Sequence, residues 1–199
     1  TIVSNNMDAD IEIKNDTAMK EHKKDRKDIL DESIVTSIKD LDGVSEVHPV
    51  VFAEITVPWE PDFSDMWMKE FYEKWLTVPY SQEKEEYQNH PENFGSSLIG
   101  IDEQEFDFLN ENLEQPINKE EFLSGKTCII YRNGLDLSNS DLIGSKVTCA
   151  LHSDKQVTQT FTIGGVTDES YYTAILGYPP TIITSDQVVK NFANESITL

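Results

Sequence analysis

The sequence predicts an α+β fold: a strand-helix-strand subdomain with a mixed sheet, carrying an inserted, smaller β-rich subdomain. One observation is a helix, a glycine stop and a long strand between Ile29 and Val57. Another is a short strand followed by a helix near the end of the chain, from Thr181 to Phe192. Between them, from Thr127 to Val166, short strand-like segments alternate with turn residues. We therefore expect the two ends of the chain to meet in one subdomain.

This reading divides the chain into three parts. Residues 1–60 and 167–199 are expected to form the sheet-and-helix subdomain, residues 61–96 a helical insertion, and residues 97–166 the β-rich inserted subdomain. A chain of 199 residues is long enough for one domain with such an insertion.

The first unit of the chain reads as strand, helix, strand. Asp8 to Lys14 alternates apolar and polar residues, as a half-buried strand does. A helix follows in which apolar residues recur at helical spacing and predict one buried stripe: Leu30, Ile34, Ile38 and Leu41. Gly43 is expected to end this helix in the left-handed conformation. A strand is then expected from Val47 to Val57, with Val50 and Phe52 giving its second face a partly covered, apolar character.

The helical insertion is unusually aromatic. Asp62 to Leu76 is expected to be an amphipathic helix with a stripe that includes Trp67 and Trp75. The stripe has three possible destinations: its own domain, a partner, or a membrane interface. The acids on its polar face disfavour the membrane. Tyr80 to Phe94 is expected to be a short helix followed by a loop.

The remaining elements follow in short order. Ser97 to Ile101 predicts a strand, and Asp102 to Leu113 a helix with acids in its first turn. Three further strands are expected to form an antiparallel or barrel-like unit: Thr127 to Arg132, Lys146 to Leu151, and Thr158 to Val166. Gly164 and Gly165 interrupt the last of these and indicate a bulge or a close backbone approach. At the end of the chain, a buried strand from Thr181 to Thr184 leads through a capping Ser185 into a helix.

Charge excludes several functions. Thirty-seven acids against sixteen bases give a net charge of −21, which argues against binding to nucleic acid or anionic lipid. No apolar run approaches the ~20 residues needed to cross a bilayer, and the N-terminus lacks the pattern of a signal peptide. We expect a soluble fragment of a longer protein, with a charged, mobile segment at Asn15 to Lys27.

The sequence offers no recognisable catalytic or metal site. It lacks the nucleophile-elbow, phosphate-loop, HExxH and dinucleotide motifs, and its four histidines are scattered, so we expect no enzymatic activity and no cofactor. Asp136 to Asp141 has the oxygens of a calcium loop without its glycine or final glutamate, and is expected to be a turn. Cys128 and Cys149 are either two buried thiols or a disulfide closing a loop of about 22 residues, worth roughly 3 kcal/mol.

The order of several short segments resembles a known family. These are LDGVSEVHPVV (41–51), LIGIDEQEFDFL (98–109), SGKTCIIYRNG (124–134), LIGSKVTCAL (142–151) and TFTIGGVTD (160–168). In this order they resemble the extracytoplasmic, MacB-like periplasmic core domain of MacB/FtsX-type ABC transporter permeases. The aromatic insertion from about Pro58 to Phe94 is longer than the family pattern, and the polar NGLDLSNSD (133–141) replaces a small helix.

The resemblance implies a location and a role. The domain would lie on the extracytoplasmic face of the cell membrane, with residues 1–60 and 167–199 nearest the membrane. Its partners would be a second permease protomer, a cytoplasmic ATPase subunit, and an exported peptide, lipoprotein or antimicrobial compound. It would transmit ATP-driven conformational change and catalyse nothing. The alternative is a free-standing secreted binding or adhesion module.

Candidate partner-binding residues come from the aromatic insertion: Trp59, Trp67, Tyr72 and Trp75. Tryptophan and tyrosine dominate binding hot spots. The alternative is that these rings dock the insertion on its own domain. In that case the candidate surface moves to the loops at Asn133 to Asp141 and at Ser153-Asp154.

Overall fold

The computed structural model divides the chain into two compact units, with the boundary between Val47 and His48. The residues it describes are 32–45, 47–58, 61–90, 94–132, 134–168 and 181–195. The strand expected at Asp8 to Lys14 and the mobile segment expected at Asn15 to Lys27 lie outside these residues.

The described part of the first unit is helix α2 (Glu32–Lys39) and the turn after it. Gly43 has a φ of 88°, which confirms the left-handed glycine predicted for the end of this helix. The burial predicted for Leu41 is wrong, because its side chain is 57% exposed. Helix α2 ends at Lys39, so Leu41 lies in the turn instead of on the helical stripe.

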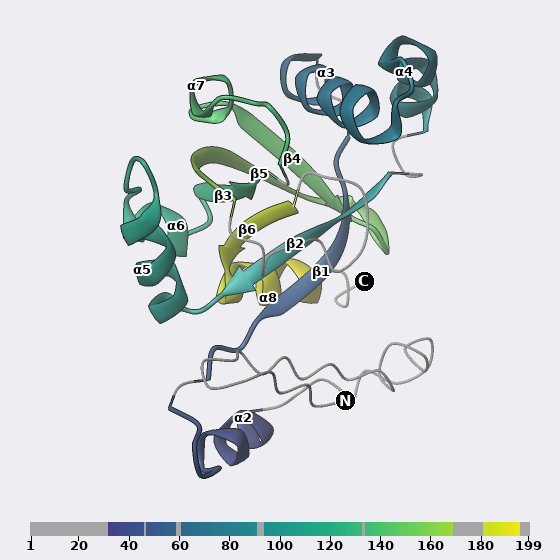
Figure 1. Cartoon of the computed structure of the whole chain (residues 1–199). Coiled ribbons are helices and arrows are strands. Elements are labelled where there is room, and N and C mark those ends of the chain that lie inside the picture. Colours follow the sequence, from purple (N-terminus) through teal and green to yellow (C-terminus); the bar gives the residue numbers. More distant parts are fainter. Residues whose placement is uncertain are drawn as a thin grey trace. The chain divides into compact units, whose positions relative to one another are not determined.

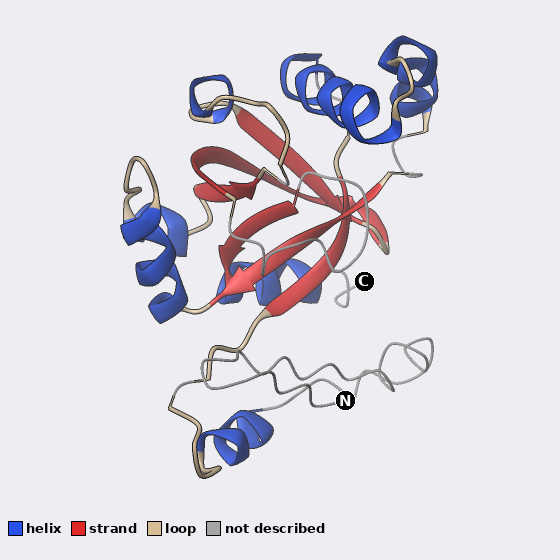
Figure 2. Ribbon diagram, in the orientation of Figure 1, coloured by secondary structure: helices blue, strands red, loops and turns tan. Residues whose placement is uncertain are grey.

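The second unit is built around a closed barrel of six strands in the order β1-β2-β6-β3-β5-β4 (Figures 1 and 2). Neighbouring strands are antiparallel except for the pairs β2–β6 and β3–β5, which are parallel. The strands are β1 (Val51–Thr56), β2 (Gly95–Ile101), β3 (Thr127–Tyr131), β4 (Lys146–Leu151), β5 (Asp154–Thr167) and β6 (Thr181–Ser185).

Helices and strands together make the α+β class correct, but the predicted arrangement of the strands is wrong. We expected β1 and β6 in one mixed sheet and the other strands in a separate β-rich subdomain. Instead β6 lies between β2 and β3, and β1 lies between β2 and β4, so all six strands share one closed sheet. The alternation of apolar residues shows which face of a strand is buried, but it does not identify the neighbouring strand.

Strand β1 also begins later than predicted. The expected strand started at Val47, whereas pairing starts at Val51. Pro49 lies between them and has no backbone N–H to donate to a ladder. The covering expected for the second face of this strand is not found, because Val50 and Phe52 are exposed.

Helix α8 (Asp186–Glu195) follows β6 directly and packs against β1, β2, β5 and β6. Its first turn is held by Ser185, whose Oγ accepts the backbone N–H of Val188 at 3.3 Å, as predicted. Val189 and Phe192 are buried in the same apolar cluster as the barrel interior. The helix approaches β2 so closely at Gly100 that a Cβ there would lie 2.7 Å from the Cα of Asp186.

A second apolar cluster lies under helices α5 (Glu103–Asn112) and α6 (Lys119–Leu123). It combines residues of β2, β3 and β6 with buried side chains of the two helices, so these strands are buried on both faces: Ile99, Ile101, Ile129, Tyr131, Ile183, Phe106, Leu109 and Phe122. The register between β3 and β5 shifts at Gly164, and a Cβ on Gly165 would lie 2.6 Å from Leu113. The predicted bulge and close approach are both confirmed.

The helical region between β1 and β2 consists of α3 (Pro61–Glu70), the π-helix η2 (Phe71–Leu76) and α4 (Tyr80–Asn89). The predicted helix over Asp62 to Leu76 is therefore continuous, but its last part has π geometry. Phe71 and Tyr72, the first two residues of the π-helix, both belong to the core cluster. None of the described helices combines the length and apolarity that a bilayer crossing requires.

Candidate functional site

Two of the four aromatic residues predicted to bind a partner are buried. Trp67 has no exposed surface and Tyr72 is 5% exposed, and both belong to the core cluster that fills the barrel. These two rings therefore dock the helical region on its own domain, which is the alternative stated for them above. Trp59 and the side chain of Trp75 lie outside the described residues.

The docking of the helical region is reinforced by hydrogen bonds from tyrosines. Tyr87 donates its hydroxyl to the carbonyl of Val57 at 2.8 Å, in a buried position at the end of β1. Tyr80 donates to Oδ1 of Asp65 at 2.9 Å, and Lys84 forms an ion pair with the same carboxylate. The aromatic side chains therefore join α3 and α4 to each other and to the barrel.

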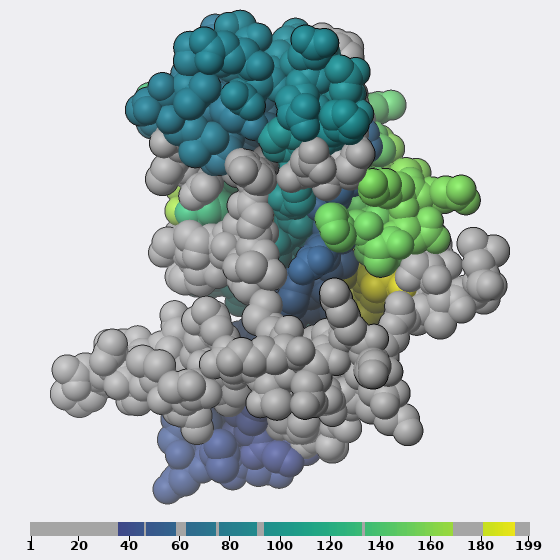
Figure 3. Space-filling model, turned by 90° about the vertical axis from the view of Figure 1, so that its right-hand side faces the viewer, coloured from purple at the N-terminus to yellow at the C-terminus, as the bar shows by residue number. Residues whose placement is uncertain are grey.

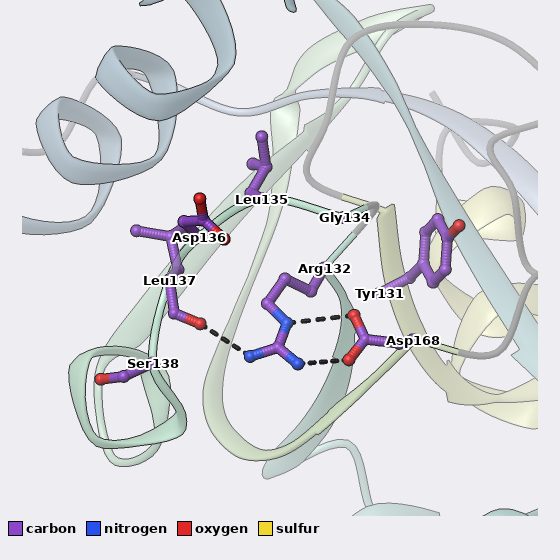
Figure 4. Close-up of a pocket in the computed structure, with 8 residues that line it drawn as sticks. All are labelled: Tyr131, Arg132, Gly134, Leu135, Asp136, Leu137, Ser138 and Asp168. Carbon is purple, nitrogen blue, oxygen red and sulfur yellow. Dashed lines mark hydrogen bonds and ion pairs between the residues drawn. The ribbon is translucent and has the colours of Figure 1, made fainter. Parts of the chain in front are cut away.

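An open pocket lies at one of the alternative sites predicted from the sequence, the loop after β3. It has a volume of about 700 Å³ and is lined by residues from the ends of β3 and β5 and from the intervening loop: Tyr131, Arg132, Gly134, Leu135, Asp136, Leu137, Ser138 and Asp168 (Figure 4). Because β3 and β5 are parallel, their C-terminal ends meet here, with Tyr131 opposite Thr167.

Arg132 organises this pocket. Its Nε donates to Oδ1 of Asp168 at 3.0 Å, and its Nη2 forms an ion pair with Oδ2 of the same carboxylate. Its Nη1 donates to the carbonyl of Leu137 at 2.8 Å (Figure 4). One guanidinium thus joins the ends of two strands to the loop, in the forked geometry that suits arginine.

The loop after β3 is held by buried leucines and by Lys74 of the helical region. Leu135 and Leu137 point into the core cluster, while Asp136 is largely exposed between them. Lys74 of η2 donates to the carbonyl of Gly134 at 2.9 Å and pairs with Asp136 at 3.0 Å. The predicted turn at Asp136 to Asp141 ends in the short helix α7 (Asn139–Leu142), which begins with a capping box between Ser138 and Asp141.

The charged side chains that line the pocket form ion pairs: Arg132 with Asp168, and Asp136 with Lys74. The hydrogen bonds that Arg132 donates to Asp168 raise the pKa of the guanidinium above its ordinary value, and burial together with the charge of Asp168 raises the pKa of Tyr131. A carboxylate ligand would have to displace Asp168 from the guanidinium. The hydroxyl of the lining residue Ser138 donates to Oδ2 of Asp141 at 2.6 Å, but both side chains belong to the capping box of α7. The arrangement is suited to holding a loop in a fixed shape that a partner can contact.

The two cysteines are buried free thiols. Both flank β5, where Cys128 is in register with Ile163 and Cys149 with Gln159. This separates their backbones by two strand spacings, or roughly 10 Å, and by four residues along the strand, whereas a disulfide needs Cα atoms within about 7 Å. Burial raises the pKa of Cys149 to about 12 and raises that of Cys128 well above its ordinary value. Neither thiol is therefore a nucleophile at neutral pH.

One cluster of ionisable side chains, formed by His48, Asp102 and Glu105, is not predicted by the sequence. Nδ1 of His48 lies 3.5 Å from Oδ2 of Asp102 and 3.9 Å from Oε2 of Glu105. Asp102 caps α5 by accepting the N–H of Glu105 at 2.8 Å. The segment that enters the barrel is thus held beside the first turn of α5. No group of three or more such side chains in the described parts of the chain has a geometry that could hold a metal ion.

Neither a family model, nor a curated protein, nor a solved structure matches this chain.

Proposed function

We propose that this chain is the extracytoplasmic domain of a MacB/FtsX-type ABC transporter permease, which transmits ATP-driven movement and contacts an exported substrate or an extracytoplasmic partner. The observation that carries the proposal is the ordered set of family-like segments. Four of them fall on elements of the barrel unit: 98–109 spans the later part of β2 and most of α5, 124–134 contains β3, 142–151 contains β4, and 160–168 covers the end of β5. The domain acts as a non-enzymatic module, with a second permease protomer and a cytoplasmic ATPase as partners of the whole protein.

Two further observations support this role. The remaining family-like segment, 41–51, spans the boundary between the two compact units, and we propose that movement of one unit relative to the other is what the domain transmits. The pocket at Arg132 is a fixed, charged loop whose groups are paired with each other, which suits contact better than catalysis.

The test uses the intact parent protein with its ATPase. Spin labels at Lys39→Cys in α2 and Gln104→Cys in α5 report the distance between the two units, and both positions are exposed. Labels at Gln104→Cys and Ser153→Cys report a distance inside the barrel unit. We expect ATP to change the first distance distribution and to leave the second unchanged.

The outcome that contradicts the proposal is equally specific. If the sequence flanking residues 1 and 199 encodes no membrane spans, or if the distance between the units does not respond to ATP, the transporter role is wrong. A free-standing secreted binding module then becomes the better account. An ATPase variant that binds ATP without hydrolysing it separates the effects of nucleotide binding and hydrolysis.

A further inference from the structure

Strand β1 is paired unequally on its two sides. On one side it pairs with β2 over its whole length, from Val51 with Gly100 to Thr56 with Gly95. On the other side it pairs with β4 only at Ile55 and Thr56. No other described strand pairs with β1. Residues 51–54 therefore have β2 as their one neighbour among the described strands, and the segment 50–54 is called the β1 edge below.

The direction of the backbone groups follows from one hydrogen bond. The N–H of His152 donates to the carbonyl of Glu54 at 2.9 Å, so the polar backbone groups of Glu54 point toward β4. In an antiparallel ladder the N–H and C=O of a residue point to the same side, and that side alternates along the strand. The N–H and C=O of Phe52 thus point toward the β4 side as well. The β4–β5 hairpin turns at His152 and Ser153, so it ends before it reaches Phe52.

The side chains of the β1 edge make it unlike a protected edge. Val50 and Phe52 are 50% and 41% exposed, and both lie on the outer face of the barrel with Glu54. The surface of β1 is visible beside the tip of the β4–β5 hairpin in Figure 3 (blue beside green). Edge strands are usually blocked by lysine, proline or a bulge, because an apolar edge with free backbone groups is a template for another strand. Positions 50–54 contain no lysine, proline or bulge; Pro49 lies directly before them, and Glu54 is their single charged residue.

We propose that the β1 edge binds an extended basic peptide segment as an added strand. The peptide backbone exchanges a pair of hydrogen bonds with Phe52, and apolar side chains of the peptide lie against Val50 and Phe52. A lysine or arginine of the peptide pairs with Glu54, the single charged residue of the edge. This mode of recognition takes affinity from the backbone and selectivity from alternate side chains.

Charge selects the partner. The chain carries a net charge of −21, so a second copy of it would be repelled, whereas a basic segment is attracted. The proposal does not depend on membership of a transporter. A free-standing domain with this edge would bind the same peptide.

The probe is a capped peptide of about eight residues, the length of a typical strand, in which lysine and valine alternate. Binding is followed by the amide resonances of the isolated domain. We expect the largest shifts at Phe52 and its neighbours in β1 and at the hairpin tip. A matched peptide of glutamate and valine should not bind, and a lysine-valine peptide with alternate backbone nitrogens methylated should lose the binding.

The protein variant complements the probes. Phe52→Pro removes an N–H that points away from β2, so the β1–β2 ladder keeps its hydrogen bonds. We expect this change to weaken binding at least about tenfold, since it removes one of the exchanged hydrogen bonds and the aromatic contact. Phe52→Tyr retains both and should bind as the parent chain does. Three outcomes would overturn the proposal: the methylated or the glutamate peptide binds as well as the lysine-valine peptide, the resonance shifts lie away from β1, or no binding is seen at millimolar peptide. The methylated peptide tests the proposal even if Phe52→Pro fails to fold.

Discussion

The two halves of β1 have opposite environments, although they belong to one six-residue strand. Ile55 and Thr56 lie between β2 and β4, and both are buried. Val51 and Phe52 have β2 on one side only, and Phe52 is exposed. The difference shows how this barrel is closed. The β4–β5 hairpin covers the later half of β1, and the earlier half extends beyond the tip of that hairpin.

The later half of β1, which lies between two strands, depends on the apolar core beneath it, so a core substitution should destabilise the protein most. Trp67 shares the apolar cluster with Ile55 and Val57, and its indole N–H is buried without a hydrogen-bond partner among the described residues. We expect Trp67→Ala to lower the free energy of unfolding by about 3–5 kcal/mol. Trp67→Phe should cost much less, because it keeps an aromatic ring and removes an unsatisfied donor. Urea denaturation measures both, and an unchanged stability in Trp67→Ala would show that this ring is outside the core.

Matched truncations in the two halves sharpen the comparison directly. Ile55 is fully buried, so Ile55→Ala is expected to cost about 2–5 kcal/mol. Phe52→Ala removes a larger side chain, yet we expect it to cost less than Ile55→Ala, because Phe52 is already 41% exposed and its truncation leaves no enclosed cavity. Equal losses in the two variants would mean that Phe52 is covered in solution.

The stability of the protein at alkaline pH tests whether Cys149 is enclosed by the barrel. Burial raises the pKa of Cys149 from 9.0 to about 12 in the folded state, so the folded state favours the neutral thiol. This contribution to stability is complete below pH 9 and is lost as the pH rises toward 12. At about 1.4 kcal/mol per unit of pKa, the loss is roughly 2–3 kcal/mol by pH 11.

The control for this experiment is Cys149→Ala, whose stability should fall less steeply between pH 9 and 11. The comparison uses the slope of the free energy of unfolding against pH, so a lower stability of Cys149→Ala at neutral pH does not affect it. If both proteins lose stability with the same slope, Cys149 ionises normally and is not enclosed by the barrel.

The partner strand of β1 offers a smaller test. A Cβ on Gly100 would lie 2.8 Å from Cγ2 of Val189 and even closer to the backbone of α8, so Gly100→Ala should cost about 1–3 kcal/mol by overpacking. At Gly95, where β2 begins, the nearest atom to a new Cβ is the carbonyl of Ile55 at 3.9 Å. Gly95→Ala should therefore change stability by no more than about 0.5 kcal/mol. Equal thermal shifts in the two variants would contradict the close packing of α8 on β2.

The sequence predicts the local elements of this fold better than their partners. The strands β2, β3, β4 and β6, the helix after Ser185 and the bulge at Gly164 follow from periodicity and from glycine chemistry. The closure of the sheet does not, because a strand with two apolar faces fits many neighbours. The alternation from Val47 predicts an earlier start for β1 than the structure has, because Pro49 cannot donate to a ladder and pairing begins at Val51.

The candidate sites show the same limit. The polarity of Asn133 to Asp141 predicts an exposed loop, but the ion pair between Arg132 and Asp168 joins the ends of β3 and β5, whose pairing the sequence does not reveal. His48 and Asp102 meet across an even longer separation in the chain. Burial of Trp67 and Tyr72 could not be separated from a partner surface, because aromatic residues serve both purposes equally well.

Amide hydrogen exchange along β1 tests the central claim most directly, namely that the barrel is closed over only half of this strand. The N–H groups of Ala53 and Ile55 point toward β2 and should exchange slowly. The N–H of Phe52 points past the hairpin tip and should exchange many times faster, close to the rate of an unprotected amide. Fast exchange at Phe52 between slow neighbours is the result that this account predicts. Protection of Phe52 equal to that of Ala53 would contradict it.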